Sequence, residues 1–218
     1  MKWSLFVKEN SQTDKEKAIE IIKDIINAKN VLFHGGNLIE KLEDREDLFG
    51  TGLFFSANHY SMTMTGETIF YVINKDNYNI VRLKSLSYKV DYNEPELEKY
   101  AKRWNISIED AFEIVIEDNQ DLIYELQSEK GWDGEDTANI SWSAQGTGLK
   151  IALNHGYDGV EGLDEQGTYY LMGMKNIDMA MQDSNRAGKY QVMLKGKPVY
   201  FTEEELEEYG IDLPIIDF

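Results

Sequence analysis

The chain has 218 residues, a length that fits one domain with a sizeable buried core. Its 42% hydrophobic and 12% aromatic residues indicate a globular fold rather than disorder. The 40 acidic residues outnumber the 22 basic ones and give a net charge of -18, so free nucleic acid and anionic membranes are poor partners and basic proteins are better ones. Acidity that serves only solubility is the alternative interpretation.

The chain lacks cysteine and lacks a long apolar segment, and both absences limit where the protein can work and which chemistry it can use. The chain has no cysteine, which removes disulfides, thiolate metal sites and a cysteine nucleophile, and which is typical of a reducing compartment. No apolar run approaches the roughly 20 residues that span a bilayer, and the apolar stretch at the N-terminus is too short for a secretory signal. We therefore expect a cytoplasmic protein with no membrane partner.

The first part of the chain alternates a helix with strands. A capping-box pattern at Thr13–Glu16, followed by apolar residues at helical spacing, predicts a helix over 14–28. The apolar run 31–36 predicts a buried strand that ends on His34 and two glycines, where the missing Cβ atoms allow a close approach. Further strands, rich in apolar, β-branched and aromatic residues, are predicted over 52–56, 68–73 and 80–83.

The middle of the chain is predicted to be all-helical. Helices should begin at Pro95 and behind the Ser107 cap, and a further helical piece should run through 122–126. The segment 130–137 is predicted to be a loop. Its acidic residues resemble part of a calcium-binding loop, but the full ligand spacing and the closing glutamate are missing, which argues against a metal.

The last part of the chain is predicted to return to strands. We expect a helix from about 141 to the glycine cap at 156, a strand pair over 157–160 and 167–172 around an acidic turn, a hairpin over 190–201 turning at 195–196, and a short helix capped by Thr202. Strands at both ends with helices between them indicate an α+β fold. We expect residues 1–218 to form a single domain.

Two strand ends supply a candidate ligand site. The first offers the imidazole of His34, and the second offers Phe54, Phe55, Ser56 and, shortly after, Tyr60. Stacking faces combined with a few polar groups are typical of small-molecule pockets. The alternative is a structural histidine at a strand end and ordinary core packing of the aromatic side chains.

Several other chemistries lack the residues that they need. The two Gly-Thr-Gly segments have no third glycine at dinucleotide-binding spacing, and no P-loop is present. Three histidines without cysteine or an HExxH motif leave a zinc hydrolase without ligands. Ser56 lacks the GxSxG context of a serine hydrolase.

The order of the motifs resembles a known family. Phe33-His34-Gly35, then Gly52–Ala57, then Gly156–Val160 before an acid at a strand start, resemble the ADP-ribosyltransferase fold of the diphtheria-toxin and poly-ADP-ribose-polymerase branch. The pattern Phe55-x-Ala57-x-x-Tyr60-x-Met62 and the run Asp164–Gly167 resemble phage anti-CRISPR ADP-ribosyltransferases more closely. The resemblance covers residues 31–175, so the N-terminal helix (1–30) and the C-terminal hairpin and helix (176–218) lie outside it. It implies an α+β domain with a split, strongly bent sheet and a helical insertion.

The resemblance also implies roles in binding NAD. His34 would donate or accept a hydrogen bond at a ribose hydroxyl, and Gly35 would let NAD lie against the strand. Phe54 and Tyr60 would sandwich the nicotinamide, Ser56 would meet a polar group of NAD, and Phe55 would be a further NAD-binding residue. Phe54 departs from the polymerase branch, which has tyrosine there; phenylalanine can stack but cannot donate a hydrogen bond.

The implied catalytic acid is Glu165 or Asp164. A fixed carboxylate would stabilise the positive charge that develops on the ribose as nicotinamide leaves, and would orient or deprotonate the incoming nucleophile. Neighbouring strand residues face opposite sides, so both acids cannot point into one pocket if the strand has already begun. We prefer Glu165, because it directly precedes Gln166-Gly167.

The sequence thus predicts a mono-ADP-ribosyltransferase that uses NAD to modify a protein. The resemblance and the acidity favour a phage-encoded inhibitor of a CRISPR or other defence complex, acting on a basic, nucleic-acid-binding target. An NAD glycohydrolase or a nucleic-acid-directed NAD-dependent transferase is one alternative, although the charge speaks against the second. A catalytically inert acidic protein that blocks a basic site is another.

Overall fold

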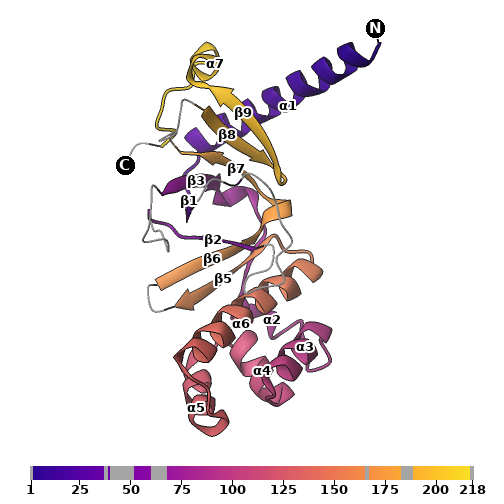
Figure 1. The fold of residues 1–218 in the computed structure, drawn as a ribbon, viewed down its shortest axis with the longest axis vertical. Coiled ribbons are helices and arrows are strands. Elements are labelled where there is room, and N and C mark those ends of the chain that lie inside the picture. Colours follow the sequence, from indigo (N-terminus) through magenta and orange to yellow (C-terminus); the bar gives the residue numbers. More distant parts are fainter. Residues whose placement is uncertain are drawn as a thin grey trace. The chain divides into compact units, whose positions relative to one another are not determined.

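A computed structural model describes residues 2–36, 39, 52–59, 68–164, 167–182 and 189–216, and for 2–12 and 189 it describes the backbone alone. Helices and strands are mixed, with two sheets and a helical segment, which confirms the α+β prediction (Figure 1). The chain divides into two compact units: unit 1 holds residues 1–42, 55–77 and 175–218, and unit 2 holds 43–54 and 78–174. The single domain expected from the sequence stays a prediction.

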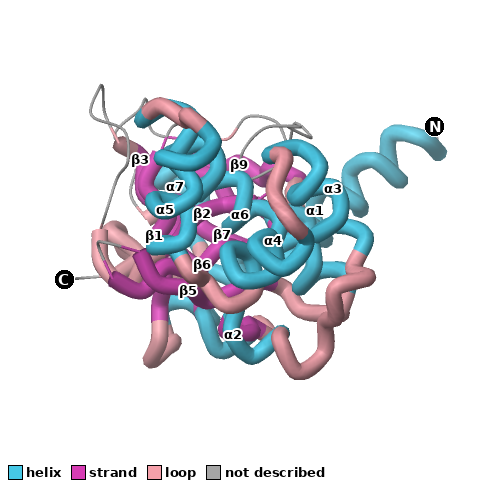
Figure 2. Tube along the Cα trace, turned by 90° about the horizontal axis from the view of Figure 1, so that it is seen from below, coloured by secondary structure: helices cyan, strands magenta, loops and turns pink. Residues whose placement is uncertain are grey.

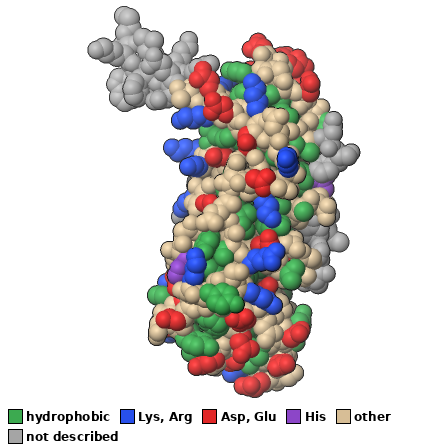
Figure 3. All heavy atoms as spheres, turned by 180° about the vertical axis from the view of Figure 1, so that it is seen from behind, with side chains coloured by type: hydrophobic (Ala, Val, Ile, Leu, Met, Phe, Trp, Pro, Cys, Tyr) green, Lys and Arg blue, Asp and Glu red, His purple; other side chains and the backbone are tan. Residues whose placement is uncertain are grey.

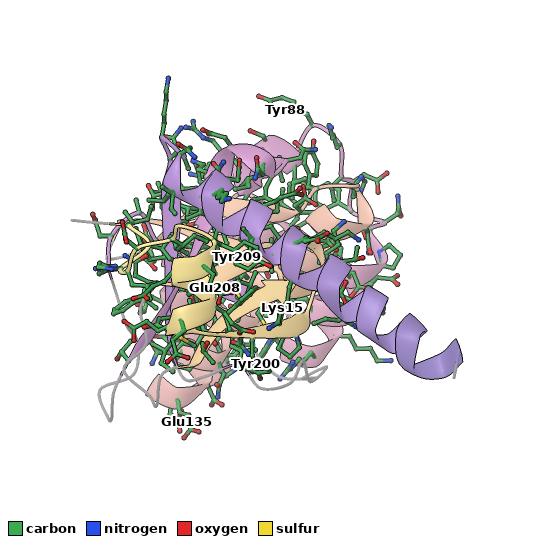
Figure 4. All side chains as sticks on the ribbon, turned by 90° about the horizontal axis from the view of Figure 1, so that it is seen from above. Lys15, Tyr88, Glu135, Tyr200, Glu208 and Tyr209 are labelled. Carbon is green, nitrogen blue, oxygen red and sulfur yellow. The ribbon has the colours of Figure 1, made fainter. Side chains whose placement is uncertain are left out.

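Unit 1 is built on a five-stranded antiparallel sheet. Its strand order is β1-β3-β7-β8-β9, with the bounds β1 Val31–Gly36, β3 Ile69–Asn74, β7 Asp178–Met181, β8 Lys189–Leu194 and β9 Lys197–Thr202. Helices α1 (Lys2–Ile26) and α7 (Glu203–Glu208) belong to the same unit, and η1 (Lys75–Asn77) follows β3. An ion pair between Lys15 and Glu205 ties α1 to the start of α7; Figure 4 labels Lys15 on α1.

One face of this sheet forms the core of unit 1 against α1. Alternate strand residues point to that face, because side chains alternate along a strand. They pack with Ala18, Ile22 and Ile25 of the helix and include Phe33, Val72, Ala180, Val192 and Phe201. The other face therefore carries the residues in between, and His34 is one of them.

Unit 2 combines a four-stranded sheet with most of the helices. The sheet order is β2-β6-β5-β4, with the bounds β2 Gly52–Phe55, β6 Gly167–Gly173, β5 Gly159–Asp164 and β4 Ile80–Arg82; β5 runs parallel to β4 and antiparallel to β6. The unit boundary falls inside β2, between Phe54 and Phe55. The helices are α2 Leu83–Leu86, α3 Pro95–Trp104, α4 Ile108–Val115, α5 Gln120–Lys130 and α6 Gly134–Asn154, and η2 (Met174–Asn176) follows β6.

The long helix α6 organises the core of unit 2. It contacts α3, α4 and α5 on its way and also packs on β5 and β6 (Figure 2). The buried cluster includes Leu97, Ile114, Ile123, Ile151 and Leu171, which come from four helices and a strand. The apolar periodicity that predicted these helices therefore marks the faces that are buried.

Two helix starts differ from the prediction. The helix predicted over 14–28 begins at Lys2, so the Thr13–Glu16 pattern lies inside α1 and is not its cap. No glycine or proline interrupts residues 2–12, and the helix continues through them. The helix predicted from about 141 begins at Gly134, because the Asp133 carboxylate accepts hydrogen bonds from the N–H groups of Glu135 and Asp136 at 2.9 Å each.

That cap also explains the acidic loop considered for calcium. Asp133 and Asp136 form the capping box of α6, so the carboxylates satisfy helix N–H groups. Among the residues that the structure describes, no group of three or more histidine, cysteine, aspartate or glutamate side chains is placed to hold a metal ion.

The acidic turn predicted over 161–166 is largely strand. β5 extends to Asp164 and stays in register with β6 up to the pair Asp164 and Gly167. The short helix α2 and the strand β7 were not predicted. The Ser107 capping box, the left-handed Gly156 and the hairpin turn at Lys195 and Gly196 are confirmed. No helix in the described ranges is long and apolar enough to cross a membrane.

Candidate active site

His34 lies near the end of β1, on the face of the unit 1 sheet opposite α1. It is half-buried, and its cross-strand partner is Tyr71 of β3. The imidazole centroid lies 5.6 Å from the Phe55 ring and 6.3 Å from the Tyr71 ring. A Cβ at Gly36 would come within 3.0 Å of the His34 Nε2, so the glycine leaves room for the imidazole. The glycines were predicted to give NAD room beside the strand, and Gly36 also gives room to the His34 ring.

A buried polar network lies on the same face. The Tyr71 hydroxyl donates to the Gln191 Oε1 and accepts from the Ile39 N–H at 3.0 Å, while the Gln191 Nε2 donates to the Ile39 carbonyl at 2.7 Å and to the Tyr200 hydroxyl at 3.3 Å. Burial raises the pKa of Tyr71 to about 12, so the hydroxyl keeps its proton. Two side chains therefore satisfy both backbone groups of Ile39, three residues after the glycines of β1.

The second predicted strand end places its residues in different surroundings. Phe55 is fully buried beside His34. Ser56 exchanges two backbone hydrogen bonds with Phe33, at 2.8 and 2.9 Å, and its hydroxyl donates to the Asn58 carbonyl. His59, which the sequence did not single out, lies with its ring centroid 4.5 Å from that of Phe33. The structure therefore brings Phe55 to His34 and keeps the Ser56 hydroxyl in a local turn.

Phe54 belongs to unit 2 and lies against its core. Its ring stacks on Tyr169 of β6, with centroids 5.4 Å apart and an interplanar angle of 21°. Phe54 and Phe55 thus have different aromatic neighbours, as adjacent residues of a strand should. Its assignment to nicotinamide stacking remains a prediction.

The acidic end of β5 carries the other described candidate, Asp164. It is half-buried and, by strand alternation, shares a face with Gly162, whose cross-strand partner is Tyr169. Asp118, in the connection between α4 and α5, accepts a hydrogen bond from the Leu163 N–H at 3.2 Å. Burial, and then the charges of Asp118 and Asp164, raise the pKa of Tyr169 well above its usual value. A protonated phenol and two carboxylates therefore gather at this strand end.

Two predicted residues, Glu165 and Tyr60, lie outside the described residues. The choice between Glu165 and Asp164 is therefore open at this point. The sequence carried no signal for Tyr71, Gln191, Asp118 or Tyr169, because each reaches its neighbours through pairing between distant segments.

The acidic residues are concentrated in two segments. Residues 91–136, which include α3, α4 and α5, hold 15 acidic and 4 basic residues, and residues 203–212, which include α7, hold 6 acidic and no basic residues. The rest of the chain has 19 acidic and 18 basic residues and is nearly neutral. Figure 3 shows acidic side chains gathered over these helices. The net charge of -18 is therefore a property of particular helices.

A protein-family comparison decides the identity of the fold. The family model for the anti-CRISPR type I-F ADP-ribosyltransferase AcrIF11 matches residues 32–180. The chain belongs to this family. The AcrIF11 match begins in β1 and ends in β7, and it contains every residue that the sequence predicted for the site. The resemblance inferred from the motifs is confirmed, and membership of an ADP-ribosyltransferase family implies the use of NAD.

Two other comparisons give less information about the family of this chain. A solved structure described as the crystal structure of an anti-CRISPR protein is similar at 21% identity and a TM-score of 0.40, over 68% of this chain and 92% of the solved one. No curated protein shows significant similarity to the chain. The AcrIF11 family model therefore carries the assignment, which makes the protein an ADP-ribosyltransferase of an anti-CRISPR family.

Proposed function

We propose that this enzyme takes NAD as a substrate and transfers its ADP-ribose to one protein of a CRISPR complex. The observation that carries the proposal is the family match over 32–180, which includes the histidine, the aromatic residues and the acids named from the sequence. The reaction breaks the bond between the ribose C1 and the nicotinamide nitrogen, which keeps the electron pair. A new bond forms from the target's nucleophile to C1, and the proton of the nucleophile passes to a base.

The proposed binding residues have the chemistry that NAD needs. His34 bonds to a ribose hydroxyl, and Gly35 has no side chain that would hold NAD away from β1. Support comes from the half-burial of His34 and from the Tyr71 and Gln191 network, which holds the backbone just beyond the glycines. On the strength of the family resemblance, Phe54 and Tyr60 are proposed to sandwich the nicotinamide. Phe55 and Ser56 are proposed as further NAD-binding residues.

A single carboxylate, Asp164 or Glu165, is proposed to stabilise the charge on the ribose. Positive charge develops there in the transition state, and a fixed carboxylate nearby stabilises it more than it stabilises the ground state. The same group accepts the proton of the nucleophile. Support comes from the position of Asp164 at the end of β5, directly before Glu165.

The proposed target is a basic, nucleic-acid-binding protein of the CRISPR complex. Support comes from the concentration of acidic residues over α3 to α5, because residues 91–136 contain 15 acidic and only 4 basic residues. A surface of one sign raises the rate of encounter with a partner of the other sign.

Labelled NAD tests the proposal directly. The protein is incubated with NAD labelled in the adenosine part and with a purified type I-F CRISPR complex, and the label is followed by gel and mass spectrometry. Label on one protein of the complex is the expected result. Release of free ADP-ribose without transfer would indicate a glycohydrolase, and no turnover would indicate an inert acidic blocker.

Amide variants separate catalysis from binding. Glu165→Gln and Asp164→Asn should differ sharply, and the essential one should lose a factor on the order of 10²–10³ in rate while NAD affinity stays close to the parent value. The exposed Glu20→Gln on α1, outside both acidic segments, is the control and should keep the parent rate. If both acid variants transfer ADP-ribose at the parent rate, the proposed role of the acidic strand end is wrong.

A further inference from the structure

The hydroxyl of Tyr169 is buried and has no hydrogen-bond partner in the part of the chain that the structure describes. The side chain is only 1% exposed. A buried polar group without a partner lowers stability, because it gives up its hydrogen bonds to water and gains none in return. Such groups are rare in folded proteins, and each one calls for an explanation.

The backbone around this hydroxyl is shaped to hold it. A Cβ on Gly162 would lie 2.4 Å from the Tyr169 Cζ and Oη, so only glycine allows the ring to lie across β5 there. Phe54 stacks on the same ring. Glycine inside a strand weakens the strand, which makes this a second locally unfavourable feature at the same place.

Asp118 is a third locally unfavourable feature. It adopts the left-handed conformation, with a φ of 53°, which is uncommon for residues other than glycine. Its carboxylate accepts from the Leu163 N–H, next to Asp164. Three features that reduce stability therefore meet at the acidic end of β5, and such features gather at functional sites, where they are retained for their role.

We propose that Tyr169 is a positioning residue whose hydroxyl donates a hydrogen bond to the Asp164 carboxylate when NAD is bound, fixing that carboxylate beside the ribose. This inference rests on the proposed function and assigns the acid to Asp164 rather than to Glu165. The geometry favours this pairing because Asp164 lies on the Tyr169 face of β5, two residues beyond Gly162. Burial, and then the charges of Asp118 and Asp164, raise the pKa of the Tyr169 hydroxyl, so the hydroxyl keeps its proton and can donate it in a hydrogen bond to a carboxylate.

Tyr169→Phe removes only the oxygen and is the test. A lost hydrogen bond to a charged group should reduce kcat about 10- to 100-fold, with KM for NAD nearly unchanged. Because the removed hydroxyl has no partner among the residues that the structure describes, the Tm should stay level or rise by about 2–4 °C. A parent-like kcat would overturn the inference, and so would a lowered Tm, which would mean that the hydroxyl is structural.

Tyr100→Phe is the matched control in the same unit. Tyr100 is also buried, but its hydroxyl donates to the Ile140 carbonyl at 3.1 Å. The same substitution there should lower the Tm and leave kcat unchanged, which is the opposite pattern.

A double variant tests whether Tyr169 acts through Asp164. In an Asp164→Asn background, Tyr169→Phe should cause little additional loss of rate, because the acceptor carboxylate is already gone. Independent, multiplicative losses would overturn the inference. If the parent protein itself consumes no NAD, the proposed function fails; if the parent is active and Tyr169→Phe equals it, only this inference fails.

Discussion

Tyr71→Phe should loosen the chain just after β1 without disturbing the strands themselves. The Tyr71 side chain is fully buried, and its hydroxyl joins the Gln191 amide to the Ile39 N–H. Phenylalanine keeps the ring and removes both hydrogen bonds, leaving two polar groups without partners. At about 1–3 kcal/mol for each of the two groups, the free energy of unfolding should fall by roughly 2–6 kcal/mol.

Hydrogen exchange reports this change where it occurs. In the parent protein the Ile39 amide is protected by the Tyr71 hydroxyl, and in Tyr71→Phe it should exchange about 10-fold faster, the equivalent of roughly 1.4 kcal/mol. Peptide-resolved exchange by mass spectrometry measures it. Peptides from the core of unit 2 are the internal reference, because the network residues belong to unit 1.

Tyr200→Phe is the matched control. Its hydroxyl accepts a longer hydrogen bond of 3.3 Å from Gln191, and the residue is 42% exposed, so water can replace the bond. Exchange at Ile39 should remain close to the parent rate. Equal exchange at Ile39 in the parent and in Tyr71→Phe would refute the argument that this network holds the segment.

Three further predictions concern binding, targeting and pH. His34→Ala should abolish the rise in Tm that NAD causes in the parent, since a ligand at about 100 times its Kd adds roughly 2.7 kcal/mol; an equal rise in both would count against the histidine. Replacing Asp121, Glu125 and Glu129 on the exposed face of α5 by amides should slow target modification and weaken its salt dependence. Three Glu→Gln changes on α7 provide the comparison. NAD hydrolysis without a target should keep its rate in both sets of variants. Because the folded pKa of Tyr71 is about 12 and its ordinary value is 10.0, its contribution to stability is complete below pH 10 and is lost as pH rises toward 12, by up to about 2.7 kcal/mol; Tyr71→Phe should unfold with a shallower pH dependence in that window.

The sequence by itself determined the local structure and the family. The Ser107 and Thr202 caps and the left-handed Gly156 appear as predicted, because each depends on a few neighbouring residues. The motifs around His34 and Asp164 were sufficient to indicate an ADP-ribosyltransferase, because the order of motifs along the chain can be read from one sequence. Two helix starts were predicted wrongly. The cap pattern at Thr13 lies inside a longer helix, and the segment with the capping box at Asp133 was predicted to be a loop, with the helix expected only from about 141.

Only the tertiary structure decided which side chains meet. Strand pairing sets Tyr71 opposite His34, and it brings Gln191 to Tyr71 across 120 positions of the sequence. The extension of β5 to Asp164, and the approach of Asp118 to Leu163, likewise depend on contacts with distant segments. Alternation predicts that Phe54 and Phe55 face opposite sides, but not which neighbour each one finds, because that is set by packing energies summed over residues far apart in the chain.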